Sequence, residues 1–258
     1  MNRFTDKVAI ITGASTGLGP VMAKMMADEG ARIVLAARRH DLVEQVAADI
    51  GNNTIAVRAD VTQEADVAAM VEEAMNRWGQ VDILMNNAAV PGKDLYIWEQ
   101  TLENWNDTIA VDLTAAMLCS REVLRRSMME RKTGAILNFS SGAGWTGLPR
   151  KSHYSSAKGA LRIFTKVVAK EVGPYEIRCN CLVPGSIDTE LHRKYWQRIA
   201  DEQGVSFEEI HERSMDSVPL KRVSTPADIA NMALFLVSDQ ARTITGQSIN
   251  VDAGYYMV

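Results

Sequence analysis

A tyrosine and a lysine four residues apart, Tyr154 and Lys158, are the side chains in this sequence best suited to acid–base chemistry. On a helix this spacing places both on one face, so the ammonium lies near the phenol. A phenol ordinarily keeps its proton at neutral pH, but a nearby cation stabilises the phenolate. The pair therefore predicts a group that donates or accepts a proton near neutrality.

Ser141 precedes Tyr154 by thirteen residues and ends the strand-like run Ile136–Ser140. When a hydride reaches or leaves a carbon, the charge on the attached oxygen changes, and that oxygen needs a hydrogen-bond donor within reach. A serine hydroxyl beside a tyrosine suits this task. Together these residues indicate the interconversion of a hydroxyl and a carbonyl.

A glycine-rich segment, Thr12–Gly19, directly follows the apolar run Val8–Thr12 and opens a helical pattern. A strand that turns sharply, approaches a pyrophosphate and packs closely on the next helix favours glycine at each of these points. The helix N-terminus then presents N–H groups to the phosphates. Pro20 lies in the first turn, where its missing N–H is not needed. This context predicts a dinucleotide site rather than an ordinary turn.

The residues after the second apolar run are Ala37, Arg38 and Arg39, with no acidic side chain for the ribose hydroxyls of NAD. A small residue and two guanidinium groups leave room and charge for a 2′-phosphate, so the sequence favours NADP. The alternative is that Arg38 lies on the adenine or faces solvent, which NAD tolerates. Asp60 is predicted either to accept a hydrogen bond from adenine or to serve only as a helix N-cap for Val61 onward.

Short apolar runs alternate with longer amphipathic stretches along the whole chain. The expected strands are Val8–Thr12, Ile33–Ala36, Thr54–Arg58, Ile83–Asn86, Ala135–Phe139, Ile177–Val183 and Ser248–Val251. The expected helices are Val21–Glu29, Leu42–Ile50, Glu64–Trp78, Trp105–Glu130, Ser156–Val172 and Ala227–Ser238. This alternation predicts an α/β fold, a doubly wound parallel sheet of about seven strands in one Rossmann-type domain spanning residues 1–258.

Composition excludes several classes of function. A hydrophobic content of 47% with 23% charged residues is ordinary for a globular protein, and the net charge of −4 gives no reason to expect nucleic acid or an anionic membrane as a partner. No apolar stretch approaches the ~20 residues of a membrane span, and the N-terminus lacks the apolar core of a signal peptide. Three cysteines (Cys119, Cys179, Cys181) show no metal-ligand clustering, so we expect no metal site and a cytoplasmic, reducing location.

Residues 191–218 interrupt the alternation with a polar, charge-rich helical stretch, predicted to be either a small lobe over the active-site cleft or a plain solvated helix pair. Several polar and aromatic side chains there and near the tyrosine hint at a polar or anionic substrate: His192, Arg193, Tyr195, Trp196, Arg150 and Lys151. Trp145 is interpreted as a wall of the substrate pocket or as core. His153 adjoins Tyr154 but faces another way, which argues against a catalytic role.

Together these motifs resemble those of the short-chain dehydrogenase/reductase family, in its single-domain form, from Lys7 to Gly254. The resemblance includes the glycine turn, Asn86–Ala88, Ser141, Tyr154, Lys158, Pro184–Thr189 and Ile244–Asp252. It implies that Tyr154 transfers the proton, Ser141 hydrogen-bonds the substrate oxygen, and Lys158 supports Tyr154 and binds the nicotinamide ribose. Motifs and resemblance together predict further cofactor contacts at Gly13, Ser15, Thr16, Gly17, Leu18, Gly19, Arg38, Arg39, Asp60, Val61, Asn87, Ala88, Pro184, Gly185, Ile187 and Thr189.

Asp112 departs from the family, which usually has asparagine as a fourth catalytic residue there. In the family the backbone carbonyl of that asparagine anchors a water in the proton relay. A carboxylate accepts hydrogen bonds but donates none unless protonated, and it adds negative charge toward Lys158. We expect Asp112 to preserve activity and alter its pH dependence; the alternative is that the position is simply tolerant. The family usually has glycine where this chain has Ala89 and Ala253. Both changes exchange one small residue for another, so we expect them to affect activity less than Asp112 does.

The sequence therefore predicts an oxidoreductase that exchanges a hydride between NADP, or alternatively NAD, and a secondary alcohol or ketone. A polar small molecule such as a sugar, polyol or hydroxy acid is slightly favoured, with a 3-oxoacyl or cyclic ketone as the alternative. A non-catalytic dinucleotide sensor is the alternative of another class, but it predicts a damaged Tyr154–Lys158 pair. The resemblance also implies a homo-oligomer, commonly a tetramer, with the helices at Trp105–Glu130 and Ser156–Val172 in one interface and Tyr255–Val258 in another.

Overall fold

Seven parallel strands form one sheet in the order β3-β2-β1-β4-β5-β6-β7 in a computed structural model that describes residues 2–51 and 53–257. The strands are β1 (Val8–Thr12), β2 (Arg32–Ala37), β3 (Thr54–Arg58), β4 (Ile83–Asn86), β5 (Gly134–Phe139), β6 (Ile177–Pro184) and β7 (Ser248–Val251). All of β1 and β4 and nearly all of β2, β5 and β6 are buried, as expected for strands covered on both faces. The predicted parallel α/β sheet is confirmed.

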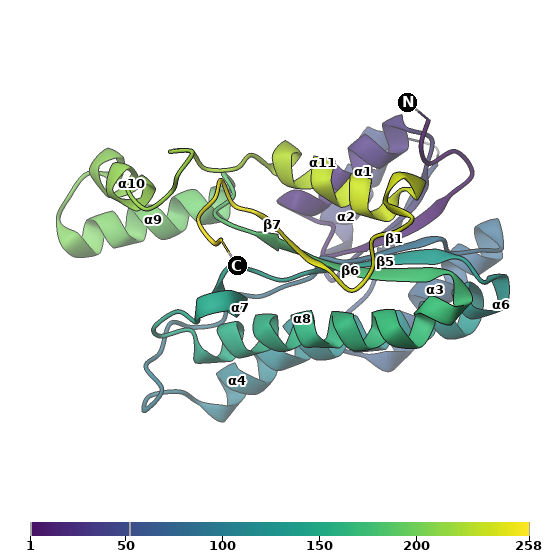
Figure 1. The fold of residues 1–258 in the computed structure, drawn as a ribbon, viewed down its shortest axis with the longest axis horizontal. Coiled ribbons are helices and arrows are strands. Elements are labelled where there is room, and N and C mark those ends of the chain that lie inside the picture. Colours follow the sequence, from purple (N-terminus) through teal and green to yellow (C-terminus); the bar gives the residue numbers. More distant parts are fainter. Residues whose placement is uncertain (1, 52, 258) are drawn as a thin grey trace.

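Helices cover both faces of this sheet (Figure 1). They are α1 (Leu18–Asp28), α2 (His40–Ile50), α3 (Glu64–Trp78), α4 (Leu102–Ile109), α5 (Ala115–Val123), α6 (Met129–Arg131), α7 (Ala143–Thr146), α8 (Ser152–Val172), α9 (Glu190–Gln203), α10 (Phe207–Met215) and α11 (Pro226–Val237). Ala9 and Ile11 of β1 pack with α1, α2 and α11, whereas Val8 and Ile10 pack with α3, α5 and α8. Among the described residues, no helix is long and apolar enough to cross a membrane.

The long helix predicted at Trp105–Glu130 is present, but it begins at Leu102 and is interrupted twice. Thr101 caps its start, since its hydroxyl accepts a hydrogen bond from the Asn104 N–H at 3.1 Å. Two π-helical turns, Ala110–Thr114 and Leu124–Met128, join α4, α5 and α6. Such turns widen a helix locally and are frequent at functional sites.

The helix that carries Tyr154 begins at Ser152, so the prediction that it begins at Ser156 is wrong. The residues from 152 to 155 carry little apolar periodicity, and the signal for the start is instead a change of chain direction. Arg150 has a left-handed backbone (φ +66°), after which the helix begins. The short helix α7 was not predicted either, because four residues are too few to show a period.

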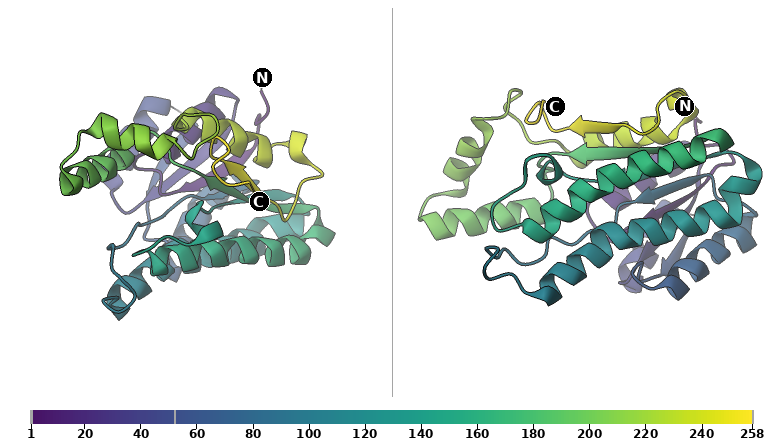
Figure 2. Two further views of the ribbon diagram at one scale, coloured as in Figure 1. Left: turned by 60° about the vertical axis from the view of Figure 1, so that its left-hand side comes forward. Right: turned by 60° about the horizontal axis from the view of Figure 1, so that its bottom comes forward.

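The loops that carry the predicted motifs meet at the carboxyl edge of the sheet. The glycine turn follows β1, Asn87 follows β4, Ser141 follows β5, and residues 185–189 follow β6. Strand order reverses between β1 and β4, and ligands of open α/β sheets bind at such a switch point. Helices α9 and α10 extend beyond this same edge, apart from the two helical layers (Figure 2), which favours the prediction of a lobe beside the cleft.

The packing of α7 on α8 gives a first prediction. A Cβ atom at Gly144 would lie 2.8 Å from the backbone carbon of Lys158 and 2.9 Å from the Gly159 nitrogen, so Gly144→Ala forces the two helices apart. We expect the free energy of unfolding to fall by about 1–3 kcal/mol in denaturant titrations. Gly173→Ala is the control, because no atom lies within 4 Å of the added methyl. Equal stability of both variants contradicts the close packing.

Candidate active site

The buried ammonium of Lys158 ties α8 to the end of β5. Its Nζ donates a hydrogen bond to the Phe139 carbonyl oxygen at 3.0 Å, and the Ser140 hydroxyl donates one to the Lys158 carbonyl oxygen at 2.7 Å. The sequence did not predict a role for Ser140, because nothing distinguishes it there from the other residues of the strand-like run Ile136–Ser140. These two bonds place Ser141, the next residue, beside the helix that carries Tyr154.

Tyr154 and Lys158 lie together on α8, as their spacing predicted. The Lys158 Nζ is 5.6 Å from the centroid of the Tyr154 ring. Lys158 is 2% exposed, whereas Tyr154 is only partly buried. The cation therefore acts on the phenol from inside the protein, while the phenol itself borders the cleft.

Asp112 lies in the first π-helical turn and forms an ion pair with Lys158, with 3.3 Å between Oδ2 and Nζ. Its Oδ1 accepts a hydrogen bond from the Val90 N–H at 2.8 Å. Burial raises the pKa of Asp112, and the Lys158 charge only partly opposes this. Burial by itself lowers the pKa of Lys158, but the Asp112 carboxylate and the nearby phenol more than offset it, so the pKa lies above its ordinary value. The ammonium therefore stays charged.

The hydroxyl of Ser141 is oriented by the turn that leads into α7. Its Oγ accepts a hydrogen bond from the Ala143 N–H at 3.3 Å. A serine hydroxyl has one hydrogen and two acceptor positions, so the hydrogen remains available to an oxygen in the cleft. The carbonyl of Ser141 accepts from the Gly144 N–H at 2.9 Å, which closes the turn.

The glycine turn is held against the end of β4 by side chains that cross between the strands. The Asn87 amide donates to the carbonyl oxygens of Thr12 (2.9 Å) and Gly13 (3.2 Å). The Thr12 hydroxyl accepts from the N–H groups of Asn87 and Ala88, each at 3.1 Å. Thr12 was absent from the predicted site; the available signal was a hydroxyl residue at the end of an otherwise apolar strand.

The glycine turn leaves the start of α1 uncovered at Gly17. Gly17 precedes α1 with φ +68°, and no atom lies within 4 Å of where its Cβ would be. The first turn of α1, which includes Leu18, contains no acidic residue, and no side chain caps the helix. Gly13 and Gly19 are needed for close packing instead, since a Cβ on either would lie 2.7 Å from the Cα of Ala88 or Ala14, respectively. The helix N-terminus thus presents N–H groups toward open space, as anion binding requires.

Two arginines and an aspartate lie near the predicted adenosine end. Arg39 donates from Nη2 to the hydroxyls of Ser15 (3.1 Å) and Thr16 (3.2 Å), which places its guanidinium over the glycine turn, while Arg38 is exposed. The Asp60 carboxylate accepts from the N–H and hydroxyl of Thr62, at 3.0 and 2.7 Å. Asp60 therefore shapes the turn before α3, but the alternative that it is the N-cap of this helix is wrong, because Gln63 occupies that position.

The Val61 side chain is 7% exposed and packs in the core, so only its backbone is free to meet a cofactor.

The segment after β6 runs along the carboxyl edge beside Ser141. The Pro184 carbonyl accepts from the Gly142 N–H at 3.2 Å, and the Gly185 N–H donates to the Val251 carbonyl at 3.0 Å. Ile187 pairs with Ser224 in a single parallel bridge. Thr189 caps α9, accepting a hydrogen bond from the His192 N–H at 3.2 Å, and its hydroxyl hydrogen can still serve as a donor.

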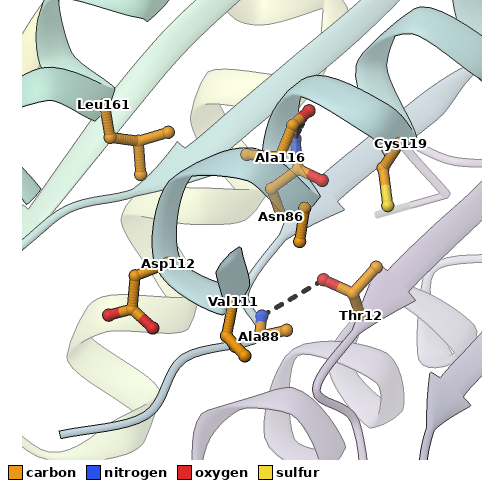
Figure 3. Close-up of a pocket in the computed structure, with 9 residues that line it drawn as sticks. Thr12, Asn86, Ala88, Val111, Asp112, Ala116, Cys119 and Leu161 are labelled. Carbon is orange, nitrogen blue, oxygen red and sulfur yellow. Dashed lines mark hydrogen bonds between the residues drawn. The ribbon is translucent and has the colours of Figure 1, made fainter. Parts of the chain in front are cut away.

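A small cavity lies beneath the site (Figure 3). Its volume is about 10 Å³, and it is lined by Thr12, Asn86, Ala88, Val111, Asp112, Ala115, Ala116, Cys119 and Leu161. This is room for about one water molecule and too little for a substrate. Among the described residues, the buried Oδ1 of Asn86 has no hydrogen-bond partner, so the cavity has a polar lining atom.

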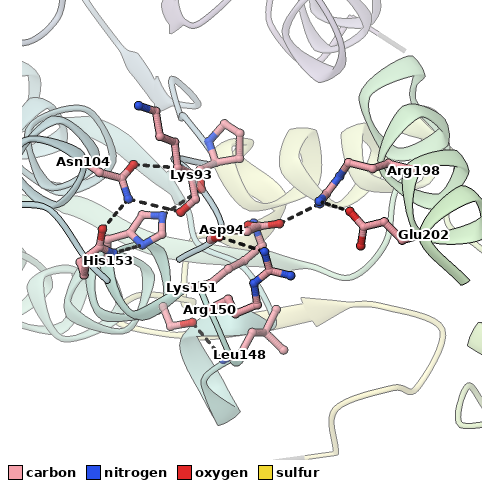
Figure 4. A network of polar contacts seen from close by, with 12 residues as sticks. Lys93, Asp94, Asn104, Leu148, Arg150, Lys151, His153, Arg198 and Glu202 are labelled. Carbon is pink, nitrogen blue, oxygen red and sulfur yellow. Dashed lines mark hydrogen bonds and ion pairs between the residues drawn. The ribbon is translucent and has the colours of Figure 1, made fainter. Parts of the chain in front are cut away.

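Asp94 joins the lobe to the rim of the cleft (Figure 4). Its carboxylate pairs with Lys151, just before α8, and with Arg198 of α9, which also pairs with Glu202. Lys151 and Arg198 hold the pKa of Asp94 below its usual value against the opposing effect of burial. The pairs that Asp94 forms with Lys151 and Arg198 span 57 and 104 residues of the chain, and they tie α9 to the segment before α8, as the predicted lobe requires and a free helix pair does not.

His153 and Trp145 are held by contacts within the fold. His153 is fully buried; its Nδ1 lies 2.7 Å from the Gln100 amide nitrogen and its Nε2 3.2 Å from the Pro91 carbonyl oxygen. The Trp145 indole N–H donates to Asn250 at 2.8 Å. His153 thus positions the loop after β4, in accord with the sequence argument against a catalytic role.

Comparisons with known proteins agree with this geometry. Residues 13–256 match a family model described as enoyl-(acyl carrier protein) reductase. The chain is 34% identical over 256 residues to the 3-oxoacyl-(acyl-carrier-protein) reductase of Chlamydia muridarum, covering 97% of this chain and 98% of that protein. It is similar to the crystal structure of the Brucella melitensis 3-ketoacyl-(acyl-carrier-protein) reductase complexed with NADH (TM-score 0.87, 34% identity, 98% of this chain and 99% of that one).

A levodione reductase structure is also similar, with a TM-score of 0.91 and 30% identity over 97% of this chain and 98% of that one. The chain therefore belongs to the short-chain dehydrogenase/reductase family of oxidoreductases, as its motifs predicted.

The Asp112–Lys158 pair gives a second prediction. Asp112→Asn removes the carboxylate that most strongly offsets the effect of burial on Lys158, so the pKa of Lys158 falls and its charge is lost at lower pH. We expect turnover at neutral pH to persist, while the alkaline limb of the pH–rate profile moves to lower pH. Asp107→Asn, an exposed carboxylate on α4, is the matched control. An unchanged profile in Asp112→Asn means that the position is merely tolerant.

Proposed function

We propose that this chain catalyses reversible hydride transfer between a nicotinamide dinucleotide and a secondary alcohol or ketone. The observation that carries the proposal is the convergence of Ser141, Tyr154 and Lys158, joined by the bonds between Lys158 and the end of β5. When bound, the dinucleotide supplies or takes up the hydride. The Tyr154 hydroxyl donates a proton to the substrate oxygen during reduction and recovers it during oxidation.

The other residues support this proton transfer. The Ser141 hydroxyl, whose oxygen accepts from the Ala143 N–H, uses its hydrogen to donate a hydrogen bond to the same substrate oxygen. Lys158, held by Phe139 and Asp112, keeps a positive charge beside the phenol. An intact set of these groups argues for an enzyme over a non-catalytic dinucleotide sensor.

For the substrate, we favour a 3-oxoacyl or cyclic ketone. The related proteins named above include 3-oxoacyl-(acyl-carrier-protein) and levodione reductases. The charges that hinted at a polar substrate are largely paired with carboxylates: Arg193 with Asp188, and Lys151 with Asp94. Paired charges attract an anion only weakly, because the opposite charge cancels their field.

A sugar, polyol or hydroxy acid is the second candidate, and one observation favours it. Arg150 is exposed near the start of α8 and donates to the Asp94 backbone carbonyl at 3.1 Å, and no ion pair to it is found among the described residues. Its charge is therefore available to a polar substrate. A panel of 3-oxoacyl esters, cyclic ketones, polyols and hydroxy acids separates the two candidates.

We further propose a reducing, cytoplasmic location and a homo-oligomer, tetrameric as is common in this family. The three cysteines are free and buried, and burial raises the pKa of Cys119 to about 12 and of Cys181 to about 11, which keeps these thiols protonated. Ile163 and Val167 are 59% and 47% exposed one turn apart on α8, an apolar surface suited to a second copy.

Tyr154→Phe tests the reaction. We expect kcat to fall about 10²- to 10⁴-fold, because the phenol oxygen that carries the proton is lost. Dissociation constants for the dinucleotide, measured by fluorescence titration, change little. Tyr175→Phe, a partly exposed tyrosine on another segment, serves as the control. If Tyr154→Phe retains turnover, another group transfers the proton. If the wild type is inactive on every substrate of the panel, the chain is a non-catalytic dinucleotide sensor instead.

Arg39→Ala tests the cofactor. We propose NADP, with Arg38 and Arg39 binding its 2′-phosphate, because the Arg39 guanidinium already lies against the glycine turn. Losing a charge-assisted hydrogen bond weakens NADP binding about 10- to 100-fold in titrations and affects NAD little. Lys24→Ala, on an exposed part of α1, is the control. If the wild type binds NAD more tightly than NADP, Arg38 and Arg39 do not form a 2′-phosphate site.

A further inference from the structure

The segment Asp252–Met257 lies beside α7 (Figure 1). The ring of Tyr256 packs on Gly142. A Cβ atom at residue 142 would come within 2.7 Å of the ring Cδ2 and 2.9 Å of its Cζ, so the ring fills the place that a side chain would take. Gly142 directly follows Ser141, and the C-terminal segment therefore borders the catalytic turn.

Hydrogen bonds hold the backbone of Tyr256 in this place. Asn250 of β7 accepts from the Trp145 indole N–H and donates to the Tyr256 carbonyl oxygen at 2.6 Å. The buried carboxylate of Asp252 accepts from the N–H groups of Tyr256 (2.9 Å) and Gly254 (3.0 Å). None of these bonds uses the Tyr256 ring, so they survive its replacement.

The turn after Ser141 is restrained from its other side by β6. The Gly142 N–H donates to the Pro184 carbonyl at 3.2 Å. Gly185 packs so closely that a Cβ there would lie 2.6 Å from the Cβ of Asp252, which fixes the C-terminal segment relative to Pro184. Gly142 thus lies between Pro184 and the Tyr256 ring. Without the ring, a glycine at this point regains conformational freedom.

We propose that Tyr256 is a positioning residue that keeps Ser141 in its productive orientation by packing on Gly142. This rests on the proposed function, in which Ser141 donates a hydrogen bond to the substrate oxygen. A donor displaced by a fraction of an ångström loses much of its effect on the transition state. The C-terminal segment is in this view part of the active site.

The segment also contacts the chain that returns from the lobe. The Leu220 N–H donates to the Ala253 carbonyl at 3.2 Å, and Pro219 packs against Gly254. These contacts anchor the segment independently of Tyr256. A loss of activity in a Tyr256 variant therefore reports the missing ring and not a detached C-terminus.

Steady-state kinetics with a ketone that the wild type reduces test the proposal. We expect Tyr256→Ala to lower kcat at least about tenfold, with dinucleotide affinity and Tm nearly unchanged. Tyr256→Phe keeps the ring and restores kcat to near the wild-type value. Met257→Ala is the matched control, because that side chain lies in the same segment and is 78% exposed. A wild-type kcat in Tyr256→Ala overturns the proposal.

A double-mutant cycle provides an independent readout. Gly142→Ala pushes against the ring and lowers kcat, but in the Tyr256→Ala background the added methyl has room, so the double variant is no worse than Tyr256→Ala alone. Losses that simply multiply contradict the proposal. If Tyr256→Ala does not fold, Tyr256→Leu replaces it in the cycle. A wild type without turnover on any ketone refutes the proposed function instead, which keeps the two failures distinct.

Discussion

A single buried charge, the ammonium of Lys158, is the constraint on which the rest of the site depends. Burying an ion is costly unless it is paired and hydrogen-bonded, and removing one partner leaves the other uncompensated. Lys158 meets this requirement through the Phe139 carbonyl and the Asp112 carboxylate. Strand β5, the π-helical turn and α8 are thereby fixed relative to one another. Ser141 follows β5 and Tyr154 lies on α8, so their positions are fixed as well.

The cofactor end depends on a similar connection between neighbouring strands. At the switch point between β1 and β4 the connections that follow the two strands lead to helices on opposite faces of the sheet. Thr12 and Asn87 hold the two strand ends together at this point. The glycine turn can therefore approach a phosphate closely without losing its shape.

The substrate end is assembled from segments that have little in common in the sequence. Asp94 follows β4 and yet pairs with Lys151 before α8 and with Arg198 in α9. Tyr256, almost at the end of the chain, packs on Gly142. The surroundings of the candidate site therefore depend on contacts between segments that lie far apart in the chain.

The sequence by itself determined the sheet, the helical layers and the placing of Tyr154 and Lys158 on one helix. The bounds of β1, β3, β4, β7 and α3 were predicted without error, because burial of successive residues leaves a local period in the chain. The spacing of Tyr154 and Lys158 is local in the same sense. Only the tertiary structure decided that Asp112 pairs with Lys158, that Thr12 joins β1 to β4, and that Tyr256 reaches the catalytic turn. These contacts join segments far apart in the chain, and no local period records which of them the packed sheet brings together.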